Sequence, residues 1–198
     1  MAIQNPQGFI PKGHLHGVVS HRQRLYPTRG SNNHTLMVGD PIHVDSSASR
    51  NIQKWPPGTV SAGSTRPIGV IVGLFDANKR PLTHYQPGRN PVIDPTTTAW
   101  VAINDDPFST FNVEYEAPAT AAAVGQYVST TVNVGNTALG RSGMKITADL
   151  TASASISHPF QIIGIADQED DAITSGASAN NDIEVIIAAH GRMSNAPA

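Results

Sequence analysis

The segment 99–116 constrains the fold more than any other part of the chain. An apolar run beginning at Trp100 ends in an Asn-Asp-Asp-Pro corner, and an alternating apolar and polar run begins at Phe111. Alternation with a period of two, bounded by Asp and Pro, is typical of half-buried β-strands joined by a turn. Apolar runs of related form occur at 67–75, 160–166 and 183–189.

The composition fits many short strands joined by tight turns. The 198 residues include 17 glycines and 15 prolines, and roughly nine or ten segments have strand character. We therefore expect an all-β protein that forms a β-barrel or a sandwich-like domain. One short helix is expected near 118–125, where an alanine-rich run follows a proline and ends at a glycine.

Three parts are expected along the chain. Prolines and glycines break any helical period in residues 1–34, which predicts an extended N-terminal arm. Residues 35–190 should form the β-barrel-like domain, with long loops at 45–66 and 76–98. Residues 191–198 should form a flexible tail.

Charge is distributed unevenly, although the net charge is only −2. Residues 1–89 hold ten Lys and Arg against three acidic residues, and residues 90–198 hold three against twelve. Two interpretations stay open. The basic arm docks on an acidic surface of a partner or of a second copy, or the two halves neutralise each other within one fold.

Several classes of protein are not expected from this sequence. The chain has no cysteine, which excludes disulfides and thiolate metal sites. No apolar run approaches the roughly 20 residues of a membrane-spanning helix, and no signal peptide is evident, so we expect synthesis in the cytoplasm and no membrane contact. The arginines lack interleaved aromatic residues, so no direct nucleic-acid binding is expected.

Two patterns imitate binding sites but depart from their requirements. The glycine-rich run 135–142 resembles a phosphate-binding loop, but it has Arg141 where that loop needs Lys, and a strand follows where it needs a helix. A β-turn is expected there. The acidic residues at 105–106 and 167–171 are candidate calcium ligands without EF-hand spacing; exposed turns or partners for the basic arm are the alternative.

Histidines provide a third candidate site. His14 and His16 would share one face of a strand, and a cupin-like metal site would be completed by a distant His84 or His190. The alternative is a pair of polar histidines on an interface. No catalytic motif is evident, so we expect a protein that is not an enzyme and has no cofactor or bound metal.

Several segments, taken in order, resemble the capsid cement or decoration proteins of tailed bacteriophages. Members of that family have a Gly-Val strand, an acid-acid-Pro corner before a Phe-bearing strand, a Ser-Gly turn and a closing strand. The corresponding segments here are 67–73, 100–108, 140–144 and 160–167 leading to 181–190.

This resemblance implies a virion structural protein on the outer capsid surface, which stabilises the shell by bridging subunits of the major capsid protein. It also implies self-association, as a homotrimer or a homodimer, and no catalytic residues. We expect the arm to make the contacts. Arg22, Arg24 and Arg29 would supply charge, and Phe9 and Tyr26 would be its apolar anchors, since aromatic residues and Arg dominate interface energies.

A virion adhesin is the alternative function. It would bind glycans through exposed Trp55, Tyr85 or Trp100 and would group these aromatic side chains on one open face. A cement protein would instead bury Trp100. A metal-binding cupin-like protein is a less favoured second alternative.

Overall fold

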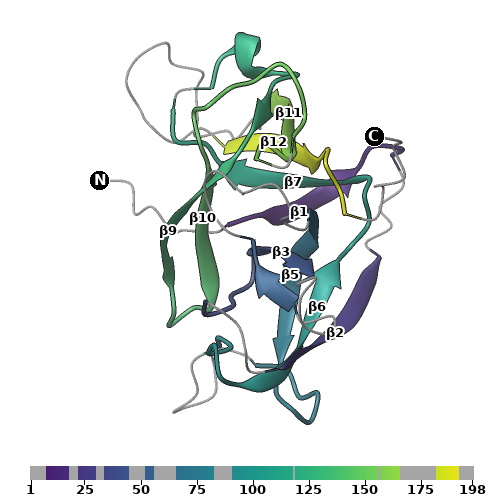
Figure 1. The fold of residues 1–198 in the computed structure, drawn as a ribbon, viewed down its shortest axis with the longest axis vertical. Helices are drawn as coiled ribbons and strands as arrows, with labels where there is room; N and C mark the ends of the chain where they lie inside the picture. The colour runs from purple at the N-terminus through teal and green to yellow at the C-terminus, as the bar shows by residue number, and fades with distance from the viewer. Residues whose placement is uncertain are drawn as a thin grey trace.

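The computed structural model describes residues 8–17, 22–29, 34–44, 52–55, 66–82, 91–117, 119–155, 157–165 and 182–191. These residues form an all-β protein with two five-stranded sheets and one two-stranded ribbon (Figure 1). The architecture is sandwich-like, and the sheets do not close into a barrel.

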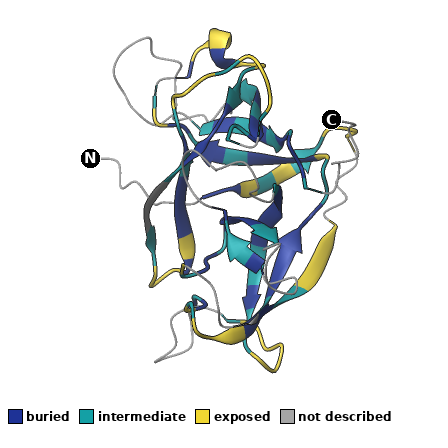
Figure 2. Cartoon of the chain, viewed as in Figure 1, coloured by how far each residue is buried: buried dark blue, intermediate teal, exposed yellow. Residues whose placement is uncertain are grey.

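The first sheet has the order β1-β7-β12-β11-β8, with antiparallel neighbours throughout. Its strands are β1 (Ile10–His14), β7 (Ser109–Glu114), β12 (Asp182–Ile187), β11 (Phe160–Ile165) and β8 (Tyr127–Val128). The alternation expected after the acidic corner is confirmed in β7, where Phe111 and Val113 are buried and Asn112 and Glu114 are less so (Figure 2). Successive side chains of a strand point to opposite faces, so one face of β7 joins the core.

The second sheet has the order β2-β6-β5-β3-β4. Its strands are β2 (Gln23–Arg29), β6 (Thr98–Asn104), β5 (Pro67–Phe75), β3 (Pro41–Val44) and β4 (Ile52–Lys54). The two edge strands, β2 and β4, contact each other, so the sheet curls around a core of its own that includes Ile42, Ile71 and Ile103. The continuous apolar run at 67–75 is the central strand β5, as predicted.

The β9–β10 ribbon joins the two sheets along one side of the molecule (Figure 1). Strands β9 (Thr130–Asn136) and β10 (Arg141–Ile146) pair with each other. One bridge from β10 reaches Val38 near the second sheet, and another reaches Tyr115 beside the first. The glycine-rich run is therefore the turn of a β-ribbon, which confirms the turn predicted there.

Gly140 ends this turn in a conformation that other residues rarely adopt. Its φ is +64°, and an added Cβ would lie 2.1 Å from the carbonyl oxygen of Pro91. Replacing Gly140 with alanine should therefore destabilise the protein by about 1–3 kcal/mol, measured by urea denaturation. Gly125→Ala is the matched control, because Gly125 also has a positive φ of +88° but no atom within 4 Å of the added Cβ. Equal losses in both variants would show that the contact with Pro91 has no effect.

The N-terminal region is not a separate arm where the structure describes it. Strand β1 pairs with β7 at one edge of the first sheet, and β2 pairs with β6 at one edge of the second. Pro11 and Pro27 argued against a helix, but a proline is tolerated in an edge strand because the edge N–H needs no partner in the sheet. The prolines therefore mark edges of the domain over 8–17 and 22–29.

Other expectations are met in part. The helix expected near 118–125 is a single 3-10 turn, η1 (Ala121–Ala123), because Gly125 follows too soon for an α-helix. The loop expected at 45–66 contains strand β4, and most of its other residues lie outside the described residues, as does the tail after Gly191. Within the described part of the chain, no helix has the length and apolarity to cross a membrane.

Candidate interaction surface

Three of the predicted interface residues converge on the carboxylate of Asp105. Arg22 Nε lies 3.7 Å from Asp105 Oδ1, and Arg24 Nε lies 3.8 Å from Oδ2. The Tyr26 hydroxyl donates a hydrogen bond of 2.7 Å to Oδ2. The Asp105 side chain is fully buried, whereas the two arginine side chains are 48% and 47% exposed. Two half-exposed guanidinium groups therefore share one buried carboxylate.

The next residue of the corner is tied to β1. His14 Nε2 lies 3.3 Å from Asp106 Oδ2, and the N–H of Leu15 donates to the carbonyl of Phe108 over 3.0 Å. The ring of Phe108 packs against His14 and His16, with centroid distances of 5.8 and 4.9 Å. The Asn-Asp-Asp-Pro corner thus joins the end of β1 to the start of β2.

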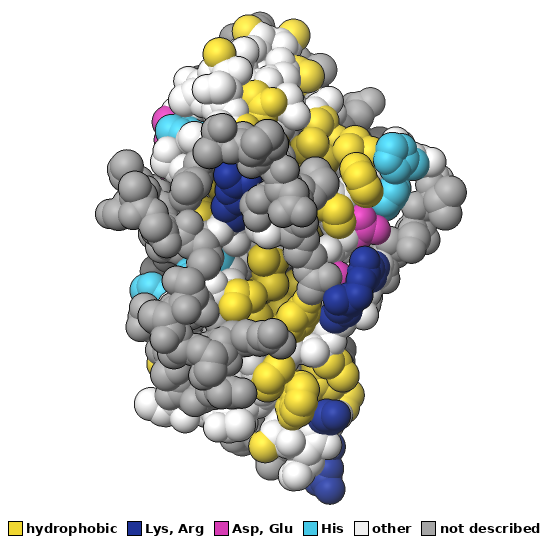
Figure 3. All heavy atoms as spheres, turned by 45° about the vertical axis from the view of Figure 1, so that its right-hand side comes forward, with side chains coloured by type: hydrophobic (Ala, Val, Ile, Leu, Met, Phe, Trp, Pro, Cys, Tyr) yellow, Lys and Arg dark blue, Asp and Glu magenta, His cyan; other side chains and the backbone are white. Residues whose placement is uncertain are grey.

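Large apolar side chains are exposed around this corner. Leu15 and Leu25 are each 46% exposed and Phe108 is 38% exposed. Figure 3 shows hydrophobic side chains on this face beside histidine, acidic and basic side chains. We call Leu15, Arg22, Arg24, Leu25 and Phe108 the corner surface. Apolar side chains beside half-exposed arginines are the composition that protein–protein interfaces favour.

Both strands at this surface are poorly suited to pairing with a strand of another molecule. β1 contains Pro11 and a register shift before Gly13. In β2 the carbonyl of Arg22 accepts the N–H of Asp105. The backbone N–H and C=O groups of even-numbered residues therefore point toward β6, and the backbone nitrogen of Pro27 points toward the outer edge of the sheet. A proline there removes a donor, and bulges and prolines are common protections of edge strands. Contacts of the corner surface are therefore expected through side chains.

The remaining predicted interface residues do not join this surface. Phe9 was expected as an apolar anchor of the arm, with packing onto its own domain as the alternative; it is 1% exposed and belongs to the main core, as the alternative has it. Its ring lies 4.9 Å from that of Phe160, so apolar packing within the chain explains its position. Arg29 ends β2, and its side chain lies outside the described residues.

The apolar part of the corner surface could not be predicted from the sequence. Leu15, Leu25 and Phe108 were not singled out, since an isolated leucine or phenylalanine carries no signal of exposure. Three interpretations were open for Asp105: a calcium ligand, an exposed turn or a partner for the basic residues. It pairs with Arg22 and Arg24, as the third interpretation predicts. Lys12–Glu184 also pairs the basic half with the acidic half, so the halves neutralise each other in part within one fold.

The histidines do not assemble the cupin-like site. Both ring nitrogens of His14 have partners, since Nε2 faces Asp106 and Nδ1 accepts the backbone N–H of His16. His190 is fully buried and His84 lies outside the described residues. Across the residues that the structure describes, no group of three or more His, Asp or Glu has a metal-binding arrangement.

The described tryptophans do not form an open aromatic face. Trp55 is fully buried in the main core, while Trp100 is half-buried and covered by Lys79, whose Nζ lies 4.4 Å from the ring centroid. Tyr85 lies outside the described residues. The full burial of Trp100 expected for a cement protein is thus not observed, nor is the grouping expected for an adhesin.

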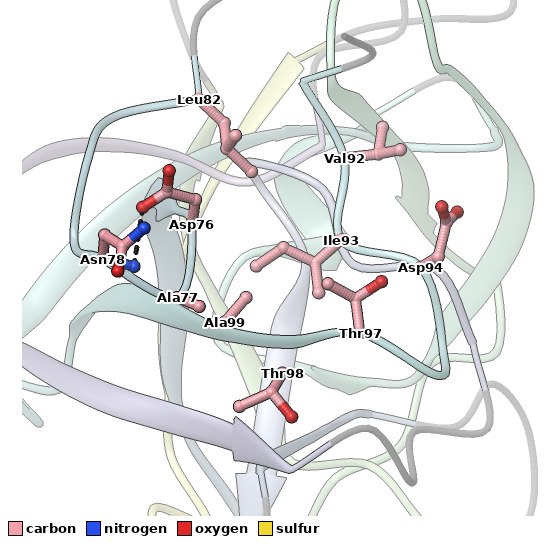
Figure 4. Close-up of a pocket in the computed structure, with 10 residues that line it drawn as sticks. All are labelled: Asp76, Ala77, Asn78, Leu82, Val92, Ile93, Asp94, Thr97, Thr98 and Ala99. Atoms are coloured by element: carbon pink, nitrogen blue, oxygen red, sulfur yellow. Dashed lines mark hydrogen bonds between the residues drawn. The ribbon is translucent and has the colours of Figure 1, made fainter.

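A cavity of about 560 Å³ opens beside the turn after β5 (Figure 4). Asp76 and Asp94 line it, together with apolar side chains that include Ile93 and Ala99. Asp76 Oδ1 accepts the backbone N–H groups of Asn78 and Arg80 at 2.8 and 2.9 Å. This carboxylate therefore holds the turn together, and the apolar lining is the end of the core of the second sheet.

One ion pair lies inside the molecule, away from the corner surface. Lys54 Nζ is 2.8 Å from Asp40 Oδ1, and the side chains are 9% and 0% exposed. Asp40 also accepts the hydroxyl of Ser142 at 2.5 Å and the N–H of Met37 at 2.8 Å. Burial raises the pKa of Asp40 above its ordinary value, and Lys54 with the hydrogen bonds opposes that shift. We call Asp40, Lys54 and Ser142 the buried junction.

The chain matches no protein-family model, and no curated protein or solved structure is significantly similar to it.

Proposed function

We propose that the protein is a non-enzymatic structural component of a bacteriophage virion. It binds the outer surface of the icosahedral capsid, associates with copies of itself and bridges subunits of the major capsid protein. A protein that binds only the assembled shell stabilises it by mass action, and many copies bound together add avidity.

The observation that carries this proposal is the corner surface. Strands at the edges of both sheets meet there and present leucines, a phenylalanine and two half-exposed arginines. The fold supports the proposal as well, because the all-β architecture fits the family that the sequence resembles. The proposal therefore places the contacts on a surface of the folded domain, where the sequence had predicted a separate N-terminal arm.

Substitutions at the corner surface test the proposal. Leu25→Ser and Arg24→Gln should each weaken co-sedimentation with empty capsid shells by about tenfold or more, because apolar and arginine side chains at an interface contribute the most energy. The melting temperature should change little, since the Leu25 side chain is almost half exposed and Asp105 keeps Arg22 and Tyr26 as partners when Arg24 is replaced.

Arg141→Gln is the matched control, since Arg141 is an exposed arginine in β10. It should bind shells as the wild type does. Wild-type protein that fails to co-sediment with shells would contradict the proposed function. Unchanged binding by both corner variants would instead place the contact elsewhere on the surface. Deletion of residues 1–30 is not an equivalent test, because it removes two strands of the fold.

A further inference from the structure

The buried junction places an amine against a carboxyl group inside a β-protein that has no cysteine. Lys54 Nζ and Asp40 Oδ1 are 2.8 Å apart, and both side chains are nearly or fully buried. From this geometry we infer that Lys54 and Asp40 condense into an intramolecular isopeptide bond in the folded protein, with release of one water molecule.

The step balances without any other reactant. A proton moves from the ammonium group of Lys54 to the carboxylate of Asp40, which gives a neutral amine and a neutral acid. The lone pair of Nζ forms a bond to Cγ, and the bond from Cγ to Oδ1 breaks. Oδ1 leaves as water with the acid proton and one proton from the amine. The product is a secondary amide that keeps Oδ2, and nothing is oxidised or reduced.

Burial of Asp40 favours its neutral acid over the carboxylate. Two charges removed from water lose solvation free energy, and their mutual attraction can fall short of that loss. Desolvation is the largest influence on the pKa of Asp40 and raises it, which favours the protonated acid. Formation of the amide removes both buried charges permanently.

The groups around Asp40 are positioned for the addition step. The N–H of Met37 donates to Oδ2, the oxygen that the amide keeps and on which negative charge develops. The N–H of Met144 donates to Ser142 Oγ at 3.0 Å, so the Ser142 hydroxyl directs its own hydrogen to Oδ1, the oxygen that leaves. Reactants held at contact distance need little further ordering.

The N-terminal segment closes this site. Gly8 lies so close to the junction that an added Cβ would be 2.5 Å from Ser142 Cβ, and the N–H of Phe9 donates to the carbonyl of Gly39 over 3.0 Å. The bond would link the start of β3 to the end of β4. A link of this kind restricts the unfolded chain as a disulfide does, in a protein that has no disulfide available.

Intact-mass spectrometry of the full-length protein under denaturing conditions tests this inference. The wild type should be lighter than Lys54→Met, after correction for the substitution, by the mass of one water molecule. Fragmentation should find the peptides that contain Asp40 and Lys54 joined. Ser142→Ala keeps both reacting groups and should show a mixture of linked and unlinked chains.

Wild-type protein at its full calculated mass, freshly purified and after prolonged incubation at neutral pH, would overturn the inference. A loss of one water that persists in Lys54→Met would also overturn it, because the loss would then arise elsewhere in the chain. The measurement does not depend on shell binding, so its outcome is separate from that of the proposed function.

Discussion

Replacing Lys54 with methionine should destabilise the fold by about 3–5 kcal/mol at neutral pH, because removal of one partner of a buried pair leaves the other charge uncompensated. Asp40 is fully buried, and Lys54 lies 2.8 Å away and is its only partner in an ion pair among the described residues. Urea denaturation of the wild type and the variant at pH 7 measures the difference. If the two side chains are linked in the wild type, the same substitution also removes that link.

The loss should depend on pH in a defined direction. Burial holds the folded-state pKa of Asp40 above the ordinary 3.8, and removal of Lys54 takes away the largest opposing influence. A group whose folded-state pKa is raised contributes stability below its unfolded-state pKa and loses it as pH rises through the folded-state pKa. The penalty of Lys54→Met should therefore be smallest near pH 4 and grow toward neutral pH.

Lys12→Met is the matched control for this prediction. Lys12 pairs with Glu184 at 3.4 Å, but the side chains are 45% and 24% exposed. An exposed pair of this kind contributes less than about 1 kcal/mol. If Lys54→Met lost no more unfolding free energy than Lys12→Met at pH 7, the prediction that burial strengthens the effect of removing Lys54 would be wrong.

Replacing Phe9 with alanine should cost about 3–5 kcal/mol of unfolding free energy, because it leaves a cavity in a packed core. The centroid of its ring lies 4.9 Å from that of Phe160 and 6.4 Å from that of Phe111, which it meets edge-on. It therefore anchors the segment before β1 to the same core that β7 and β11 share. Thermal and urea denaturation would both detect a loss of this size.

Phe9→Ala also separates the observed fold from the expected arm. A side chain that served only as an interface anchor would weaken shell binding and leave the stability of the isolated protein unchanged. Leu15→Ala is the control, since Leu15 is 46% exposed and should cost less than about 0.5 kcal/mol. The opposite ranking of the two variants would contradict the burial of Phe9.

Hydrophobic periodicity was sufficient to predict several strands, but it did not predict β1, β2 and β4, nor the partners of any strand. The run at 67–75 is β5 at the bounds expected, and the alternating run after the acidic corner is β7. Both signals are local, because the pattern of apolar and polar residues along a strand shows whether one or both of its faces are buried. The weakest predictions concern residues 1–34. Pro11 and Pro27 there break the helical period, and no alternation typical of a strand replaces it.

Long-range pairing explains what the sequence could not supply. Asp105 attracts Arg22 and Arg24, which lie some 80 residues earlier in the chain, because β2 returns to lie beside β6. The buried junction likewise brings Ser142 to Asp40 through the β9–β10 ribbon. No local pattern distinguishes these polar residues from the many that lie on the surface. Only the topology brings them together.

The order of strands in the first sheet has a consequence for synthesis on the ribosome. β12, at residues 182–187, lies between β7 and β11, so this sheet stays divided until nearly all described residues have been translated. The second sheet uses only residues 23–104 and can pair much earlier. β1 can pair with β7 once residue 114 has been translated, but this pair cannot join β11 and β8 until β12 has been added between them. Nascent chains stalled before codon 182 should therefore present core side chains of β7 and β11, such as Phe111 and Phe160, to chaperones.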